Sequence, residues 1–249
     1  MKALRAFLAV FVLFFLAPIG ISFAVTEREP VTAWTTARRD PTGLAPDPAK
    51  TPEAVIQVYA ARAFAWRGIF AVHTWISVKP AGASHYTRYE VIGWGVQRGV
   101  PAIRVDRMGP DNYWFGARPE IYVDRRGEGV DELIERVRKA VETYPWPNEY
   151  RPWPGPNSNT FIAWIAREVP ELRLDLPPTA IGKDYLNGLP VAVAPSGTGL
   201  QVSLFGLLGA MIAFEEGVEV NVLGLTLGLD FKTPGVKLPG IGRVGFPQE

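Results

Sequence analysis

The pattern of hydrophobic and polar positions changes three times along the chain, and each change predicts a boundary. Residues 6–25 are apolar and uncharged, whereas residues 26–52 are rich in proline and in small or charged residues and show no periodicity. Residues 53–186 mix β-branched and aromatic runs with two helical periodicities, and residues 187–249 are rich in Gly, Leu and Val. These patterns predict a signal peptide or membrane anchor (1–25), a proline-rich tether (26–52), an α+β domain (53–186) and a β extension (187–249).

Short runs of β-branched and aromatic residues predict an antiparallel sheet in the α+β domain. Two strands are expected on either side of a turn near Arg67 and Gly68, the second from Phe70 to Val78. Further strands are expected at residues 88–94 and 102–107. The fold class is therefore α+β, with an antiparallel sheet packed against a few helices.

Two stretches have apolar residues at helical spacing and predict those helices. The first runs from Asp131, which can cap its start, to Tyr144. The second begins near Ser158, with Asn157 as its N-cap, and ends before Pro170.

The β extension contains an apolar stretch, residues 200–231, that Glu215 and Glu216 divide into two halves. Neither half is long enough to span a bilayer as a helix. Alternation over residues 218–222 favours a long β-hairpin with glycines at bends. We expect this hairpin to pack as an extension of the core.

The N-terminal segment has the composition of an export signal. Lys2 and Arg5 precede the apolar stretch, and small residues at Ser22 and Ala24 offer a cleavage point, so both a cleaved signal peptide and a retained spanning helix fit. The mixed run Glu27-Arg28-Glu29 follows the stretch, and the positive-inside rule then places the rest of the chain outside the cytoplasm. We expect a cell-envelope protein on the periplasmic side, inner-membrane anchored or exported.

Composition removes several classes of function. The chain has no cysteine, which excludes disulfides, a thiol nucleophile, cysteine metal sites and a lipidated cysteine anchor. After the first 25 residues, 24 basic residues stand against 25 acidic ones, so nucleic acid is not an expected partner. The aspartates lack metal-ligand spacing and the glycines lack the context of a phosphate loop, so neither a metal nor a cofactor is expected.

Two elements offer candidate chemistry, and each also has a purely structural interpretation. Alternation places His73 on one strand face with Trp75 and Ser77, as a base or as a structural residue, whereas His85 lies in a polar turn. In the stretch Gly155–Phe161, Ser158 opens a helix beside free backbone amides that could hold an oxyanion, or the stretch simply caps the helix.

In this order the two elements resemble the circularly permuted papain-like enzymes, which include permuted NlpC-type peptidases and lecithin-retinol acyltransferase relatives. His73-Thr-Trp-Ile76 is similar to their histidine strand, and Asn157-Ser-Asn-Thr-Phe161 is similar to their Asn-Cys-x-x-Phe helix start, with serine in place of cysteine. The resemblance covers residues 54–170 and implies Ser158 as nucleophile, His73 as base and Glu90 as the residue that orients the imidazole. The GPNSNTF stretch also resembles a motif of a bacterial exported family of unknown function.

Serine in place of cysteine leaves two functions open. A serine hydroxyl is a poor nucleophile until a base removes its proton, so the fold could survive as a binding or scaffolding module without turnover. The alternative is a serine-dependent amidase, peptidase or acyltransferase that acts on an envelope peptide, lipid or ester. For a cell-wall peptide or lipid ligand, the candidate binding residues are Asn157, Asn159, Trp75 and Trp153. An aromatic groove could form from the loop 144–153 together with residues 113–115, although packing over the sheet is the simpler expectation.

Overall fold

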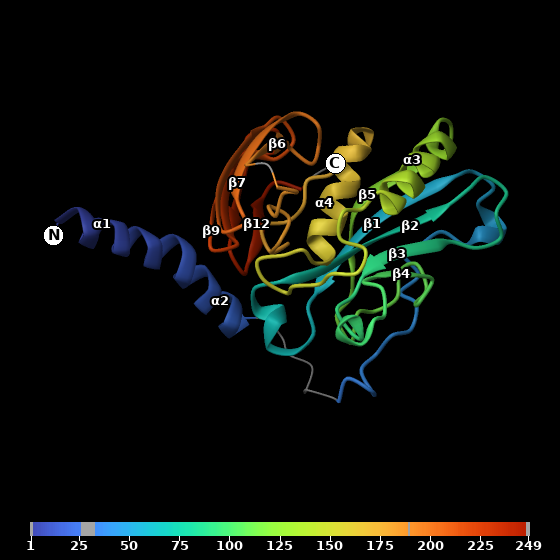
Figure 1. Cartoon of the computed structure of the whole chain (residues 1–249), viewed down its shortest axis with the longest axis horizontal. Coiled ribbons are helices and arrows are strands. Elements are labelled where there is room, and N and C mark those ends of the chain that lie inside the picture. Colours follow the sequence, from blue (N-terminus) through green and yellow to red (C-terminus); the bar gives the residue numbers. More distant parts are fainter. Residues whose placement is uncertain (1, 26–32, 189, 248–249) are drawn as a thin grey trace.

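The computed structural model describes residues 2–25, 33–188 and 190–247. Two antiparallel sheets flank the helix α4 (Ser158–Glu168), and a long N-terminal helix projects away from the body beside the C-terminal sheet (Figure 1). The fold class is therefore the expected α+β, with antiparallel sheets, a few helices and a C-terminal region of hairpin-connected strands.

The first sheet has five strands in the order β4-β3-β2-β1-β5. Their bounds are β1 (Val55–Arg62), β2 (Val72–Lys79), β3 (Thr87–Val91), β4 (Ile103–Val105) and β5 (Glu120–Arg126). A short 3-10 helix, η3 (Ala65–Ile69), occupies the expected turn between β1 and β2, and η4 (Val96–Arg98) lies between β3 and β4. Strand β5, which the sequence pattern did not reveal, pairs with β1 and makes β1 a central strand.

Helices α3 (Val130–Glu142) and α4 pack on one face of the first sheet. Asn157 caps α4 as expected, because its side chain accepts from the backbone N–H of Asn159 and Thr160, and the Thr160 hydroxyl accepts from the N–H of Asn157. The expected cap of α3 is wrong. Gly129, with a positive φ, occupies the N-cap position, and Asp131 lies in the first turn, where it accepts from the N–H of Ala81.

The other face of the first sheet is covered by the chain that was expected to be a tether. Residues 26–32 of that stretch lie outside the described residues, but Ala37 and Leu44 pack with Tyr59 and Trp75 in a second hydrophobic cluster. Asp111 fixes the segment, since its Oδ2 accepts from the N–H of Leu44 at 2.6 Å. Strands β1 and β2 are consequently buried on both faces.

The second sheet is larger than the single long hairpin expected from its alternation. It is a seven-stranded meander in the order β12-β11-β10-β9-β8-β7-β6, so each strand pairs with its neighbours in the chain. The strands are β6 (Val191–Val193), β7 (Gly199–Leu204), β8 (Leu208–Ala213), β9 (Gly217–Val222), β10 (Leu225–Asp230), β11 (Gly235–Leu238) and β12 (Gly242–Gly245). The 3-10 helix η5 (Pro170–Leu172) follows α4 and begins the connection to this sheet.

A buried ionic network joins the second sheet to the rest of the protein. Both oxygens of Glu219 on β9 are engaged, Oε2 by Lys183 at 2.5 Å and Oε1 by Lys237 at 2.7 Å. Lys237 on β11 also donates to Asp175 at 2.6 Å, and Lys183 donates to Asp184 at 3.0 Å. We call these five residues the ionic junction. The charges of the ionic junction come from strands of the second sheet and from the chain that precedes it. The face of the second sheet that meets this chain must therefore be polar.

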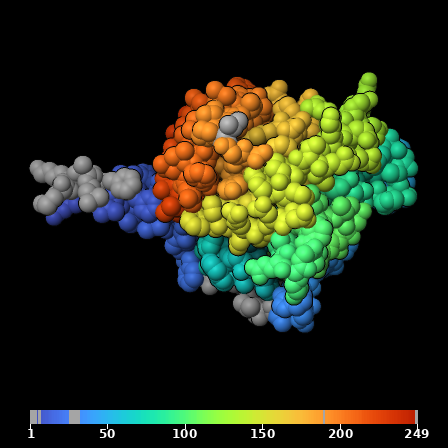
Figure 2. All heavy atoms as spheres, in the orientation of Figure 1, coloured from blue at the N-terminus to red at the C-terminus, as the bar shows by residue number. Residues whose placement is uncertain are grey.

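The N-terminal helix is continuous and consists of α1 (Lys2–Phe11), the π-helical turn η1 (Val12–Leu16) and α2 (Ala17–Val25). The stretch Leu8–Val25 is long and apolar enough to cross a membrane, with a mean hydropathy of 2.6. Ser22 in this helix donates to the carbonyl oxygens of Ile69 and Gly240. The segment that was expected to be a signal or membrane anchor is thus an apolar helix, compatible with either role, that contacts the folded body (Figure 2).

Candidate functional site

Three buried polar residues converge on the face of the first sheet that lies away from the helices. His73 on β2 donates from Nε2 to Glu90 Oε2 on β3 at 2.9 Å, and the Arg88 guanidinium donates to the same oxygen at 2.7 Å. The expected contact between His73 and Glu90 is therefore formed. All three side chains are nearly inaccessible to solvent, so this is an interior cluster.

Aromatic rings enclose the imidazole and the guanidinium. The His73 ring stacks on Trp114 with ring centroids 3.6 Å apart, and the Arg88 guanidinium lies 4.0 Å from the centroid of Trp75. Trp94 extends the stack outward from Trp114 and is the exposed end of it. Such stacking fixes the imidazole plane in an apolar environment.

Burial and charge set the protonation of this cluster. Desolvation lowers the pKa of His73 below its usual value, and the Glu90 carboxylate opposes the shift without reversing it. Burial alone would raise the pKa of Glu90, but Arg88 and His73 together hold it below its usual range. The ground state is therefore a neutral imidazole beside an ionised Glu90–Arg88 pair. Glu90 Oε1 and Arg88 Nε are buried without a hydrogen-bond partner in the part of the chain that the structure describes.

Asn157, Ser158 and Asn159 begin α4 on the opposite face of the sheet. Thr74, which follows His73 in β2, donates from Oγ1 to the carbonyl oxygen of Ser158 at 3.2 Å and to Asn159 Oδ1 at 3.0 Å. Successive side chains in a strand point to opposite faces, so Thr74 faces α4 and His73 faces away from it. Within the described ranges, no hydrogen bond joins Ser158 to His73 through their side chains. The pairing of Ser158 with His73 that the resemblance implied is not formed.

The amides and aromatic rings expected to bind a ligand are mostly engaged inside the protein. Asn157 and Asn159 each donate to the carbonyl oxygen of Ile181, at 3.0 and 2.8 Å, and both are buried. Trp75 is fully buried and donates to the carbonyl oxygen of Pro110. Trp153 is the exception, since its ring is exposed while its Nε1 donates to a backbone carbonyl. Three of these four residues therefore offer no surface to a ligand.

The aromatic groove is not formed either, because its two halves lie on different faces of the first sheet. Tyr144 packs with Phe161 in the core under the helices, whereas Trp114 and Phe115 belong to the cluster on the other face. Tyr144, Trp114 and Phe115 pack over the sheet, which was the simpler expectation, whereas Trp153 is exposed.

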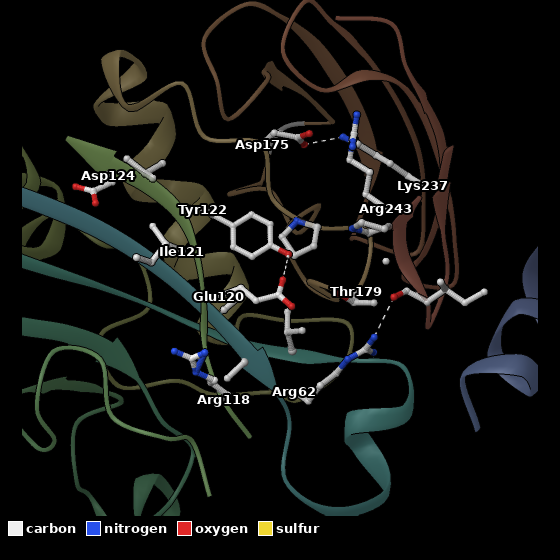
Figure 3. A pocket seen from close by; sticks show the side chains of 18 residues that line it. Arg62, Arg118, Glu120, Ile121, Tyr122, Asp124, Asp175, Thr179, Lys237 and Arg243 are labelled. Carbon is white, nitrogen blue, oxygen red and sulfur yellow. Dashed lines mark hydrogen bonds and ion pairs between the residues drawn. The ribbon is translucent and has the colours of Figure 1, made fainter. Parts of the chain in front are cut away.

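An open cavity of about 580 Å³ lies between the two sheets. Its walls come from the ends of β1 and β2, from β5, from the segment at residues 175–179 and from β11 and β12 (Figure 3). Charged side chains of both signs line it, namely Arg62, Arg118, Glu120, Asp124, Asp175, Lys237 and Arg243.

Most of the cations in this cavity are held by internal partners. Arg62 donates to the carbonyl oxygens of Gly240 and Ile241, and Arg243 is paired with Asp230. Arg118 differs, because it is exposed and has no hydrogen bond or ion pair among the described residues. Glu120 is likewise exposed, and within residues 2–25, 33–188 and 190–247 it accepts only a long hydrogen bond of 3.4 Å from the Tyr122 hydroxyl. Arg118 and Glu120 are thus the charged groups best placed to meet a ligand.

The sequence pattern did not predict this cavity or the ionic junction. The cavity residues are far apart in the chain and come together only because β5 and the second sheet are placed next to β1. One signal was present, since Glu219 and Lys237 interrupt apolar strands at alternate positions. That alternation indicates a strand with one polar and one apolar face, but it does not indicate which face points inward.

The capping of α4 can be separated from any role of the Ser158 hydroxyl by two substitutions. Asn157→Ala removes the acceptor for two helix N–H groups and a buried donor to Ile181, so we expect a loss of about 2 kcal/mol or more in the free energy of unfolding. Ser158→Ala removes a hydroxyl without a hydrogen bond among the described residues, and we expect a change within about 0.5 kcal/mol. Urea unfolding of both variants measures this difference, and equal losses would contradict the assigned roles.

The buried imidazole predicts a loss of stability in mild acid. Because burial lowers the pKa of His73 in the folded state, the unfolded chain binds more protons once the pH falls below about 6.5, and the free energy of unfolding decreases with it. Glu90, with its lowered pKa, adds a further loss at still lower pH. Urea unfolding at several values between about pH 7.5 and pH 5, the range in which histidine titrates, measures how the free energy of unfolding changes with pH.

His73→Gln should remove the part of this slope that lies near pH 6. His85→Gln is the matched control, because it deletes the other histidine from an exposed turn. A wild-type protein whose stability does not change in this window, or a slope that follows His85, would contradict the assignment.

Comparison with known proteins identifies one family. The family described as DUF3750, protein of unknown function, matches residues 53–185. Neither the curated proteins nor the solved structures contain a significant match to the chain. The matched stretch is more than half of the 249 residues and includes the first sheet, both packed helices, His73, Glu90 and Ser158. The chain therefore belongs to the DUF3750 family.

Proposed function

We propose that this protein is a non-catalytic binding module of the cell envelope, held at the membrane or exported by its N-terminal helix. The observation that carries the proposal is the separation of Ser158 from His73 by the thickness of the first sheet. A serine hydroxyl needs a base within hydrogen-bond reach to become a nucleophile. The His73–Glu90 pair supplies a base and its orienting carboxylate, but no hydroxyl of the described residues is hydrogen-bonded to it.

The helix start packed against a central strand is the part of the fold that supports a relationship to the permuted papain-like proteins. In this proposal the scaffold has kept that packing and has lost the catalytic constellation. Asn157 and Asn159 then act as structural ties between α4 and the carbonyl oxygen of Ile181. The serine at position 158 fits this structural role, because its small side chain is accommodated in the buried helix start and carries no reactive thiol.

The cavity between the sheets is the proposed ligand site. It carries an exposed cation at Arg118 and an exposed carboxylate at Glu120, so a ligand with both an acidic and a basic group would find a partner for each. Burial raises the pKa of Asp175 in the cavity lining to about 6, and its carboxylate is already paired with Lys237 (Figure 3). Cell-wall peptides carry carboxylates and amines on one short chain, and we propose this class of ligand on the periplasmic side.

A serine-dependent acyl transfer remains the alternative, and covalent labelling separates the two functions. We expect no labelling of the wild-type protein by a fluorophosphonate probe. We also expect an iodoacetamide probe to label Ser158→Cys no faster than it labels a free thiol. Modification of Ser158 in the folded protein would overturn the non-catalytic proposal.

Direct binding tests the cavity itself. Isothermal titration of the full chain in detergent with a muramyl tetrapeptide is expected to show saturable binding. Arg118→Ala should weaken that binding about tenfold through the lost charge-assisted contact, while Arg98→Ala, which removes an exposed cation distant from the cavity lining, should leave it unchanged. Absent binding, or equal affinities for wild type and Arg118→Ala, would rule out this site.

A further inference from the structure

The second sheet has its faces reversed relative to an ordinary soluble sheet. On β7, Gln201 and Ser203 are buried while Leu200, Val202 and Leu204 are exposed. The same alternation continues on β9, where Glu219 and Asn221 are buried between exposed valines. The ionic junction explains the inner face, because its charges require polar partners there. The outer face is left with the apolar side chains.

These outward side chains form a continuous apolar surface. One row crosses all seven strands through direct strand partners, and its members are Val193, Leu200, Ile212, Val218, Leu229, Val236 and Val244. A second row adds Val191, Val202, Ala210, Val220 and Leu227. We call this surface the apolar sheet face. Ile212 is 66% exposed, and no strand position on this face carries a charged residue within residues 190–247.

Exposed phenylalanines surround the apolar sheet face at the hairpin tips. Phe205 and Phe214 lie at successive turns and are 75% and 66% exposed, and Phe231 and Phe246 lie beyond β10 and β12. A contiguous apolar surface of this extent marks an interaction site rather than ordinary protein surface. The question is what covers it.

The N-terminal helix indicates the occupant. Its middle turn, η1, contacts β10, Phe15 is buried there, and α2 runs beside the end of the sheet (Figure 1). The same helix is long and apolar enough to span a bilayer. In a bilayer that surrounds this helix, the strands that contact the helix therefore lie at the same depth as its middle turn. The strand ladders satisfy the backbone of the inner strands, so hydrocarbon contact leaves few polar groups unpaired.

We propose that the apolar sheet face rests in the outer leaflet of the membrane beside the N-terminal helix, which makes the second sheet a membrane-seated platform. The polar cavity and the first sheet then face the aqueous side. This inference does not rest on the proposed ligand, since it uses only the orientation of the second sheet and its contact with the helix.

The absence of cysteine makes the test direct, because each introduced cysteine is a single labelling site. The full chain is reconstituted in vesicles of phosphatidylcholine and phosphatidylglycerol, with an environment-sensitive fluorophore at Ile212→Cys or Val220→Cys. Glu132→Cys on the exposed side of α3 is the matched control. Lipids with brominated acyl chains are expected to quench the fluorophore on the sheet about threefold more than the one on α3. Circular dichroism of each labelled variant verifies that the fold is retained.

Two results would overturn the proposal. Equal quenching at Ile212 and Glu132 would show that the apolar sheet face does not touch the acyl chains. A spin label at Ile212→Cys in the same vesicles tests for a second copy of the chain, and a strong dipolar coupling between two such labels would show that protein covers the face instead of lipid.

Discussion

The carboxylate of Glu219, held between two lysines, is the interaction on which the architecture depends. Burial would raise the pKa of this carboxyl, but Lys183 and Lys237 keep it below the usual value, so the group is ionised inside the protein. A buried carboxylate of this kind is tolerated only while its partners stay in place. Lys183 comes from the chain that follows α4 and Lys237 from β11, so the contact ties the second sheet to the α+β domain. The same requirement turns the apolar side of that sheet outward.

Strand β2 imposes the second constraint. Its neighbours β1 and β3 hold it in the middle of the first sheet, with α4 on one face and the N-terminal segment on the other. Because His73 and Thr74 are adjacent in this strand, their side chains lie on opposite faces of the sheet. Thr74 binds the start of α4, whereas His73 joins Glu90 in an aromatic interior. A motif of neighbouring residues that resembles an enzyme site is thereby divided between two faces.

Local signals in the sequence were sufficient for much of the fold. Helical spacing and the Asn157 cap located α4, and runs of β-branched and aromatic residues located β1, β2 and β3. Alternation in the second half indicated strands but only one hairpin of the seven-stranded sheet. The pairing of His73 with Glu90 was also accessible, because both lie at inward positions of neighbouring strands. Long-range placement was not accessible. Strand β5 pairs with the distant β1, and Leu44 is held by Asp111, 67 residues away. The inward direction of Glu219 depends on Lys183 and Lys237, 36 and 18 residues away, and no local pattern encodes any of these contacts.

A double-mutant cycle on Lys183 and Glu219 tests the central contact most directly. Lys183→Met and Glu219→Gln are made singly and together, and the free energy of unfolding of all four proteins is measured with urea at neutral pH. We expect a coupling free energy of about 2 kcal/mol or more, because each single substitution removes one of the two partners of a buried charge. A coupling within about 0.5 kcal/mol would show that the two residues act independently and would contradict the role of the ionic junction.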